Sequence, residues 1–320
     1  MPDTICVDLG GSSVKLARVS ADGRLTLGPV LSVPSSPEDL GPLAAALVGL
    51  GRSSTDDRLG AAGLALPGIV DERGLVASNA KYDGFAGVDL RGWLATTTGL
   101  PESCVVVEND ARSALLGELA AGCAVGVKDA VLVILGTGVG TAVAHDGQLL
   151  VGAHGHAGVL GGHLTVAVGG PPCTCGNLGC AEAIAGSWAL GRTWRAVVGE
   201  PPPAHLVPLG YHGLLDAAAA GDAAAAAVWT AVRDVLVALV VDLCHAHDPD
   251  VVIFSGGPLQ HPMVDVLGLM DDVHRRLYPS SHRPTALRAT DPASSVLLGL
   301  DHLARRAIRP GTTTQPTGAA

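Results

Sequence analysis

Four side chains of the kind that bind zinc lie close together in the middle of the sequence. The segment from Gly162 to Glu182 reads GHLTVAVGGPPCTCGNLGCAE and contains His163, Cys173, Cys175 and Cys180. Zinc binds four nitrogen and sulfur ligands in a tetrahedron, and the glycines and prolines of this segment let a short chain fold around one ion. Because four protein ligands leave no position for a water molecule, the spacing predicts a structural zinc site rather than a catalytic one.

The same cysteines could instead be buried thiols, or Cys173 and Cys175 could form a disulfide bond. A bridge across one intervening residue is strained, and the histidine lies at a spacing typical of metal ligands, so zinc is the favoured interpretation. The other cysteines lie in apolar segments and are expected to be reduced core residues. They are Cys6, Cys104, Cys123 and Cys244.

The length and composition of the chain exclude several classes of protein. A chain of 320 residues predicts two domains, and 48% hydrophobic residues with only 3% aromatic ones predict cores of Ala, Val and Leu, which suit helices packed on sheets. The formal net charge is -10 and the sequence has no run of Lys and Arg, so nucleic acid and anionic membranes are not expected as partners. Small molecules are the expected partners.

The sequence favours a cytoplasmic protein. It begins Met1-Pro2-Asp3 and continues directly into a strand-like run, without a basic region or a cleavage signal. The apolar stretch from Val228 to Val241 contains Arg233 and Asp234, so we expect a buried core helix there rather than a membrane span.

Three strand-like runs each lead into a glycine-rich turn. They are TICVDLGGSS from Thr4, AVLVILGTGVG from Ala130 and DVVIFSGGP from Asp250. Such turns let backbone N–H groups approach a phosphate closely, because glycine accepts positive φ and has no side chain. A single turn of this kind could be a simple strand exit, and none of the three is a Walker A or GxGxxG motif. Their repetition favours phosphate binding.

The first two of these segments continue alike, which suggests an internal duplication. VKLARVSADGRLTLG and TAVAHDGQLLVG each contain an Asp-Gly turn between alternating apolar residues, the signal of a short hairpin. Helical spacing is found over residues 39–50, 108–122 and 213–246, and either Asn109 or Asp110 is placed to cap the second of these helices. The segment from Pro310 resembles a frayed tail.

Taken together, these motifs resemble the ROK family of sugar kinases and repressors, which share the ribonuclease H-like fold of hexokinase, actin and the Hsp70 ATPases. The resemblance covers nearly the whole chain. Its motifs are VDLGGSSVK and LGTGVG for phosphate, LALPGIVD for sugar, VENDARSALLGE for the catalytic aspartate, HLTV with CTCGNLGCAE for zinc, and HDPDVVIFSGG for adenosine. ROK repressors have a DNA-binding helix-turn-helix ahead of this core, whereas here the first phosphate strand begins at about residue 4, so a kinase is favoured over a repressor.

The resemblance implies an α/β protein with a two-lobed ribonuclease H-like (actin/hexokinase ATPase) fold and a cleft between the lobes. We expect a small lobe over residues 1–120, completed by a C-terminal helix over 293–308. The large lobe should cover 121–292 and include the zinc module 163–182, followed by a disordered tail over 309–320.

The resemblance also assigns roles to residues on the phosphate side. Backbone N–H groups of the two phosphate loops would hold the phosphates, Asp8 would hold Mg²⁺ through water, and Lys15 would reach phosphate or remain a solvated strand lysine. The two loops are Gly10, Gly11 and Ser12, and Gly136, Thr137, Gly138 and Gly140. Gly256 and Gly257 belong to the adenosine motif.

On the sugar side the resemblance makes Asp110 the general base that accepts the proton of the sugar hydroxyl. On local grounds alone, Asp110 would be a helix N-cap. The implied sugar contacts are Pro67, Gly68, Asn79, Asn109, Asp110, His163 and Glu182. Asn79 could equally be an ordinary loop residue.

One position departs from the family pattern. Family members have Glu-x-Gly-His ending at the zinc histidine, whereas this chain reads AGVLGGH, with Leu160 or Val159 in place of the glutamate. Neither side chain accepts a hydrogen bond, so the chain should be less selective for the family's usual polyol or should bind a different one. His154 and His156 lie nearby in sequence and could substitute, or could simply be solvated.

The sequence thus predicts an ATP- and Mg²⁺-dependent kinase that phosphorylates a hydroxyl of a hexose or hexose-like substrate, with glucose as the default. N-acetylmannosamine, allose and a C7-cyclitol or carbasugar remain open as substrates. A sugar-sensing regulator without turnover and an Hsp70-like ATPase are alternatives, against which Asp110 and the zinc module argue respectively. A homodimer or tetramer is expected.

Overall fold

The structure is a computed structural model that describes residues 2–11, 13–52, 59–71, 76–78, 83–207 and 210–308. Contacts divide the chain into two compact units. Unit 1 comprises Met1–Val125, Val151–Ala157 and Ala293–Ala320, and unit 2 comprises Gly126–Leu150 and Gly158–Pro292. The segment 151–157, which lies within the expected large lobe, therefore makes its contacts with unit 1. The predicted tail over 309–320 lies outside the described residues.

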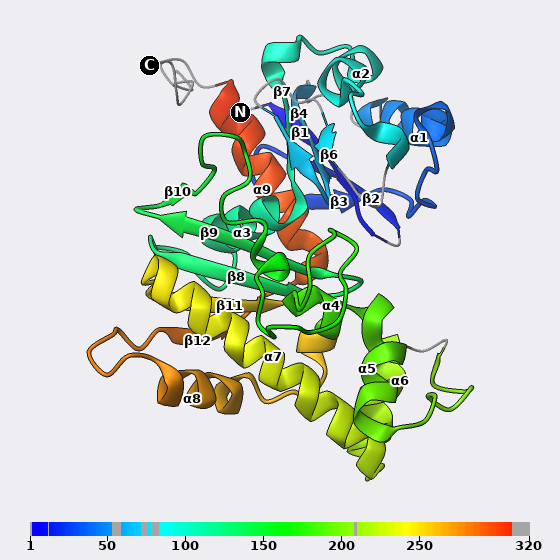
Figure 1. Cartoon of the computed structure of the whole chain (residues 1–320). Coiled ribbons are helices and arrows are strands. Elements are labelled where there is room, and N and C mark those ends of the chain that lie inside the picture. The colour runs from blue at the N-terminus through cyan, green and yellow to red at the C-terminus, as the bar shows by residue number, and fades with distance from the viewer. Residues whose placement is uncertain are drawn as a thin grey trace. The chain divides into compact units, whose positions relative to one another are not determined.

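Unit 1 is built on a five-stranded sheet with the strand order β3-β2-β1-β4-β7 (Figure 1). Its strands are β1 (Asp3–Leu9), β2 (Val14–Val19), β3 (Leu25–Leu27), β4 (Leu59–Leu66) and β7 (Val105–Asn109). Strand β1 pairs antiparallel with β2 and parallel with β4. All seven residues of β1 are buried, as expected for a central strand that has helices on both faces. A small second sheet joins β5 (Ile69–Val70) and β6 (Val76–Ser78).

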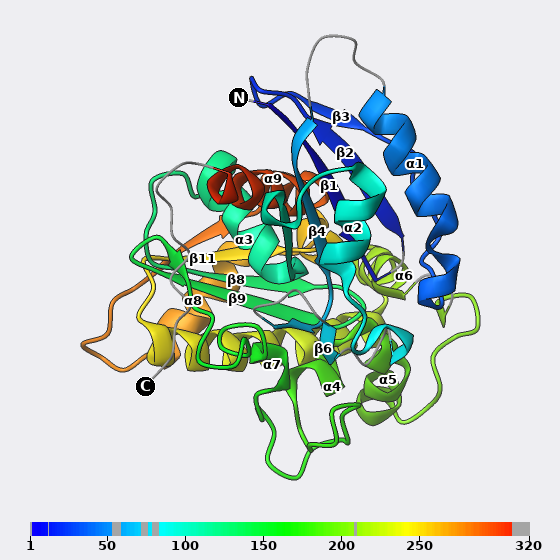
Figure 2. The ribbon, with the colours of Figure 1, turned by 90° about the horizontal axis from the view of Figure 1, so that it is seen from above.

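Four helices cover the sheet of unit 1. They are α1 (Gly41–Arg52), α2 (Leu90–Thr98), α3 (Asp110–Ala121) and α9 (Pro292–Ala307). Helices α1 and α2 lie on one face and α3 and α9 on the other (Figure 2). The second face is tightly packed, because a Cβ added at Gly63 of β4 would come within 3.0 Å of Leu300 in α9. Helices α3 and α9 also pack closely on one another, because a Cβ added at Gly117 of α3 would lie 1.9 Å from the carbonyl oxygen of Ser295 in α9.

Unit 2 repeats the topology of unit 1. Its sheet has the order β10-β9-β8-β11-β12, in which β8 pairs antiparallel with β9 and parallel with β11. The strands are β8 (Ala130–Leu135), β9 (Val139–His145), β10 (Gln148–Leu149), β11 (Val251–Ser255) and β12 (Thr285–Arg288). The predicted hairpins are therefore present in both units. In the second, Asp146 and Gly147 turn the chain with φ of 47° and 73°, as a two-residue hairpin turn requires.

Five helices of unit 2 are described, and the long helix α7 lies at the centre of their packing (Figure 1). They are α4 (Ala181–Ala185), α5 (Leu190–Val198), α6 (Gly210–Ala219), α7 (Ala223–His247) and α8 (Val266–Arg276). The region 213–246 that the sequence predicts to be helical is covered by α6 and α7, which are separated by residues 220–222. In this turn Gly221 has a φ of 93°, and the Asp222 side chain caps α7.

Helix α7 is the one described helix that is long and apolar enough to cross a membrane. Its apolar side chains, among them Val228, Leu236 and Val240, are buried in the core of unit 2, which agrees with the prediction of a core helix. The seven cysteines are free thiols. Cys6 and Cys244 are buried as predicted, whereas Cys104 and Cys123 are only partly buried, which corrects their assignment to the core.

Candidate functional site

The first predicted phosphate loop follows the end of β1 and has an acidic residue beside it. Asp8 in β1 is only 5% exposed and lies opposite Lys15 of β2 in the strand register. Lys15 Nζ lies 3.8 Å from Asp8 Oδ2, so this lysine is paired with the acid rather than simply solvated. Gly10 and Gly11 follow in the turn, and Ser12 lies outside the described residues.

Asp8 binds its proton more tightly than an ordinary aspartate. The pKa of Asp8 is raised to about 7, first by burial and second by the negative charge of Asp110, while the Lys15 ammonium group partly offsets this rise. Asp8 and Asp110 therefore act on one another electrostatically within unit 1. A divalent cation near Asp8 would reverse this effect by stabilising the charged carboxylate.

We expect Asp8→Asn to stabilise the metal-free protein at pH 8 but much less at pH 5. The pKa of Asp8 is raised above its unfolded value of 3.8, so the folded state holds the proton longer and wild-type stability falls as the pH rises from about 4 to 7. The asparagine variant escapes this loss, which is on the order of 1.4 kcal/mol per pKa unit. Urea unfolding in EDTA at both pH values measures the difference.

The exposed Asp22 provides the control for this measurement. Its pKa is lowered, mainly by the Ser20 hydroxyl group, so both its folded and its unfolded forms are charged at pH 5 and at pH 8. Asp22→Asn should therefore change the unfolding free energy equally at the two pH values. If Asp8→Asn also changed the unfolding free energy equally at pH 5 and pH 8, the result would contradict the assignment of a raised pKa to Asp8.

The start of helix α3 decides between the two candidate capping residues. Asn109 is the N-cap: its Oδ1 accepts hydrogen bonds from the N–H groups of Ala111 at 3.0 Å and Arg112 at 3.2 Å. Its Nδ2 donates to the carbonyl oxygen of Gly68 at 2.9 Å. Asp110 is the first residue of the helix, and its Oδ1 accepts from the Ala111 N–H at 2.8 Å. The local interpretation of Asp110 as the cap is thus wrong.

The predicted sugar-side residues of unit 1 are only partly brought together. The bond from Asn109 to Gly68 joins the turn after β4, which contains Pro67 and Gly68, to the helix that begins with Asp110. Asn79 lies outside the described residues. The sugar contacts of these residues stay predictions.

The second phosphate loop of unit 2 is held from several sides. Its residues Gly136–Gly138 lie between β8 and β9 and Gly140 lies within β9, and the Gly136 N–H donates to the Gly138 carbonyl oxygen at 3.0 Å. Glu182 Oε2 accepts from the Val139 N–H at 3.0 Å, and the Ser187 N–H donates to the Gly136 carbonyl oxygen at 3.1 Å. The sequence alone did not indicate that Glu182 contacts this loop.

Glycine is required at two positions around this loop. A Cβ at Gly138 would lie 2.3 Å from Glu182 Oε2, so the loop can meet the carboxylate only without a side chain there. Gly256 has a φ of 94°, and a Cβ there would lie 2.0 Å from the carbonyl oxygen of Leu135. The structure therefore brings the adenosine motif, Gly256 and Gly257, against the strand that leads into Gly136.

The predicted zinc ligands converge in unit 2. The ligand atoms of His163, Cys173, Cys175 and Cys180 all lie within 4.8 Å of one another. Cys175 Sγ and Cys180 Sγ are 3.7 Å apart, and Cys173 Sγ is 3.6 Å from His163 Nδ1. A tetrahedral zinc ion with bonds of about 2.3 Å to sulfur and 2.0 Å to nitrogen separates its ligands by roughly 3.6–3.8 Å. The four side chains therefore fit a zinc ion with four protein ligands.

The segment before the predicted zinc histidine, residues 150–162, contains no acidic residue. Leu160 precedes a short turn, Gly161–His163, and is 42% exposed, while Val159 is partly buried. Thr141 Oγ1 holds this turn by donating to the Gly158 carbonyl oxygen at 2.7 Å and accepting from the Gly161 N–H at 2.9 Å. A Cβ at Gly162 would lie 2.0 Å from the Val139 carbonyl oxygen, so this turn also packs on the second phosphate loop.

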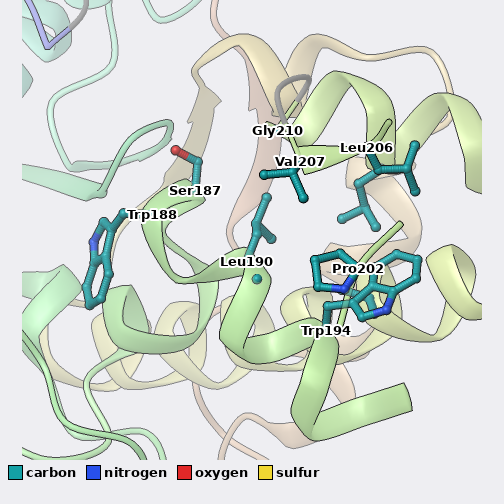
Figure 3. A pocket seen from close by; sticks show the side chains of 11 residues that line it. Ser187, Trp188, Leu190, Trp194, Pro202, Leu206, Val207 and Gly210 are labelled. Atoms are coloured by element: carbon teal, nitrogen blue, oxygen red, sulfur yellow. The ribbon is translucent and has the colours of Figure 1, made fainter. Parts of the chain in front are cut away.

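Unit 2 also contains an apolar pocket of about 250 Å³ beside Ser187 (Figure 3). Trp188 lies on one side of it and Trp194 and Pro202 on the other. None of the sequence-predicted site residues is among the described residues that line it. The pocket nevertheless adjoins the predicted phosphate loop, because the N–H group of Ser187, which lines the pocket, donates to the Gly136 carbonyl oxygen at 3.1 Å.

Comparison with known proteins gives consistent matches. The ROK family model matches residues 4–306. A glucokinase of Halalkalibacterium halodurans is 32% identical over 268 residues, which are 78% of this chain and 79% of that protein. An N-acetylmannosamine kinase of Citrobacter koseri is 38% identical over 185 residues, which are 57% of this chain and 61% of that protein.

A solved structure confirms the predicted fold class. A glucokinase from Streptomyces griseus in complex with glucose and AMPPNP superposes with a TM-score of 0.77 at 27% sequence identity. The match covers 95% of this chain and 99% of that one. The α/β fold with two five-stranded sheets is therefore the two-lobed fold that the sequence predicts.

Proposed function

Since the chain belongs to the ROK family, we propose that it transfers the γ-phosphoryl group of ATP to a hydroxyl group of a hexose or hexose-like sugar. The observation that supports this most directly is the start of α3. Asn109 caps the helix, so the carboxylate of Asp110 is not needed for that purpose and can serve as a base. Relatives named glucokinase and N-acetylmannosamine kinase agree with a sugar kinase.

The proposed reaction is a displacement at phosphorus. The sugar oxygen forms a bond to the γ-phosphorus, the bond to the β-phosphate oxygen breaks, ADP leaves with the electron pair, and Asp110 takes the hydroxyl proton. The N–H groups of Gly10, Gly11 and the loop 136–140 stabilise charge on the phosphates. Mg²⁺ supplies charge neutralisation at the phosphates when bound, and Asp8 is its proposed anchor through water.

The remaining site residues complete the proposal. Gly256 and Gly257 are the proposed adenosine contacts. The proposed sugar contacts are Pro67, Gly68, Asn79, Asn109, Asp110, His163 and Glu182. In this assignment zinc is structural, since its four ligands are protein side chains. A cytoplasmic location and a homodimer or tetramer remain predictions, and sedimentation equilibrium tests the second.

The acceptor need not be glucose. The family's glutamate before the zinc histidine is replaced by Val159 or Leu160, so one hydrogen-bond acceptor for sugar hydroxyls is missing. N-acetylmannosamine, allose and a C7-cyclitol or carbasugar are therefore candidate substrates beside glucose.

A substrate screen tests the proposed function. Purified protein with ATP and Mg²⁺ is assayed for ADP release against glucose, other hexoses, N-acetylmannosamine and cyclitols. Turnover with at least one acceptor is expected. Tight binding of a sugar in calorimetry without any ADP release would instead support the alternative of a sugar-sensing regulator.

We expect Val159→Glu or Leu160→Glu to improve kcat/KM for glucose relative to the preferred acceptor. A hydrogen bond to a charged acceptor is worth roughly 1.5–3 kcal/mol, which corresponds to roughly 10- to 150-fold in affinity. Val168→Glu is the control, because Val168 in the same module is 99% exposed. A wild-type KM for glucose in the low micromolar range, unchanged in both variants, would show that another group, such as His154 or His156, supplies the missing hydrogen-bond acceptor.

A further inference from the structure

A buried arginine follows the proposed base by two residues. Arg112 of α3 is 2% exposed and is among the largest fully buried side chains of the chain. Its Nη2 donates to three backbone carbonyl oxygens, those of Val151 at 3.3 Å, Gly155 at 2.9 Å and Ala157 at 2.8 Å. All three belong to the segment 151–157, so one guanidinium group holds this whole segment.

The segment 151–157 is a closed loop. The Ala157 N–H donates to the Val151 carbonyl oxygen at 3.1 Å, and Gly152 and Gly155 turn the chain with φ of 71° and 75°. A Cβ at Gly155 would lie 3.1 Å from the carbonyl oxygen of Val70 in β5, so the loop also lies against that strand. The loop is therefore fixed between α3 and the strand that follows Gly68.

An acid also lies beside the guanidinium group of Arg112. Arg112 Nη1 lies 3.4 Å from Glu108 Oε1, which also accepts from the Asn109 N–H at 2.8 Å. A buried charge is costly unless it is paired and hydrogen-bonded, and carbonyl oxygens of the loop meet part of this need. Removing the guanidinium group should therefore change the conformation of the loop 151–157 more than that of helix α3.

We propose that Arg112 is a positioning residue that sets acceptor affinity by fixing the loop 151–157, whose exposed His154 and His156 contact the acceptor. This inference rests on the proposed kinase function. Asn109 and Arg112 flank Asp110 in the sequence, and each binds a distant segment. The Asn109 side chain donates to the Gly68 carbonyl oxygen, and the Arg112 side chain donates to carbonyl oxygens of the loop. A shift of this loop changes acceptor binding and leaves the phosphate loop after β1 in place.

A second buried arginine of unit 1 provides a matched control. Arg305 of α9 is 8% exposed, lies 2.7 Å from Asp301 one turn earlier, and donates to the carbonyl oxygens of Pro2, Val19 and Ser20. Its contacts are thus of the same kind as those of Arg112. They lie where β1 begins, at the opposite end of that strand from Asp8.

The test compares Arg112→Lys and Arg112→Met with Arg305→Lys and Arg305→Met. For Arg112→Lys we expect the acceptor KM to rise by about tenfold or more, with the ATP KM within about twofold of wild type. Hydrogen exchange of the loop 151–157 should accelerate. The Arg305 variants should lose comparable thermal stability and keep the acceptor KM, and Arg112→Met should exceed Arg112→Lys in its effect.

Two results would overturn the proposal. One is an equal rise of both KM values in the Arg112 variants, and the other is an acceptor KM that rises as much in Arg305→Lys. A wild type that phosphorylates no acceptor refutes the kinase function instead, so the two failures are distinguishable.

A double-mutant cycle tests the route through the histidines. If Arg112 acts through His154 and His156, Arg112→Lys should raise the acceptor KM much less in a His154→Ala/His156→Ala background than in wild type. Additive effects of the two changes would contradict this route.

Discussion

Asp110→Asn is expected to lower kcat by a factor on the order of 10² to 10⁴ while sugar and nucleotide binding stay close to wild type. Asparagine has nearly the same shape and can still accept the Ala111 N–H bond that Asp110 Oδ1 accepts at 2.8 Å. It cannot accept the proton of the sugar hydroxyl. Single-turnover kinetics measures the chemical step, and calorimetry measures the two affinities.

A second readout accompanies this variant. The charge of Asp110 contributes to the raised pKa of Asp8, so its removal should lower that pKa and shift the pH dependence of unfolding. Asp89→Asn is the control, because Asp89 caps α2 in unit 1 without belonging to the proposed site. Near-normal turnover in Asp110→Asn would remove Asp110 from the mechanism.

The strands of the fold were predictable because their signals are local. A buried apolar run followed by a glycine turn marks β1, β8 and β11, and an Asp-Gly pair marks the hairpin at Asp146 and Gly147. Both signals depend on backbone conformations that few other residues accept. The repeated pattern therefore predicts the repeated sheet topology as well.

Contacts between distant segments were not predictable in this way. The loop 151–157 lies between segments of unit 2 in sequence, and it joins unit 1 because Arg112 binds its carbonyl oxygens. Glu108 stands four residues before Arg112 in the sequence, but it lies in β7 whereas Arg112 lies in α3, so the spacing rule for pairs on one helix face does not predict their contact. Similarly, the sequence shows Glu182 beside the zinc ligands but not that it points at Val139.

In the candidate site, too, some features were predictable from the sequence and others were not. The zinc ligands were predicted because ligand spacing within one short segment determines the site. The choice between Asn109 and Asp110 as the helix cap was not predictable, because both residue types cap helices well. The extended backbone of Asn109, with φ of −64° and ψ of 142°, decides it. A one-residue difference in the helix start thus changes which of the two side chains caps the helix.

The zinc module is connected to the second phosphate loop at both of its ends. Gly162, next to His163, packs on the Val139 carbonyl oxygen. At the other end, Glu182 follows Cys180 by two residues and accepts the Val139 N–H. Loss of the metal should therefore disturb the phosphate loop as well as the module itself.

Cys175→Ala is accordingly expected to lose zinc, thermal stability and sugar binding together. Wild-type protein should contain about one zinc ion per chain, since the four side chains fit one tetrahedral site. Without one thiolate, the remaining ligands hold the metal weakly, and its binding free energy no longer stabilises the folded module. Elemental analysis, thermal unfolding and sugar calorimetry measure the three losses.

Cys104→Ala is the matched control, because Cys104 is a free, partly buried thiol of unit 1 outside the zinc cluster. It should keep its zinc and its affinity for sugar. Because Val139 links the module to the phosphate loop, the ATP KM of Cys175→Ala should also rise, by about tenfold or more if the loop loses its Glu182 contact. Native protein that contains no zinc yet has full activity would refute the metal site, and a Cys175→Ala variant with an unchanged ATP KM would show that Glu182 holds the loop without help from the metal.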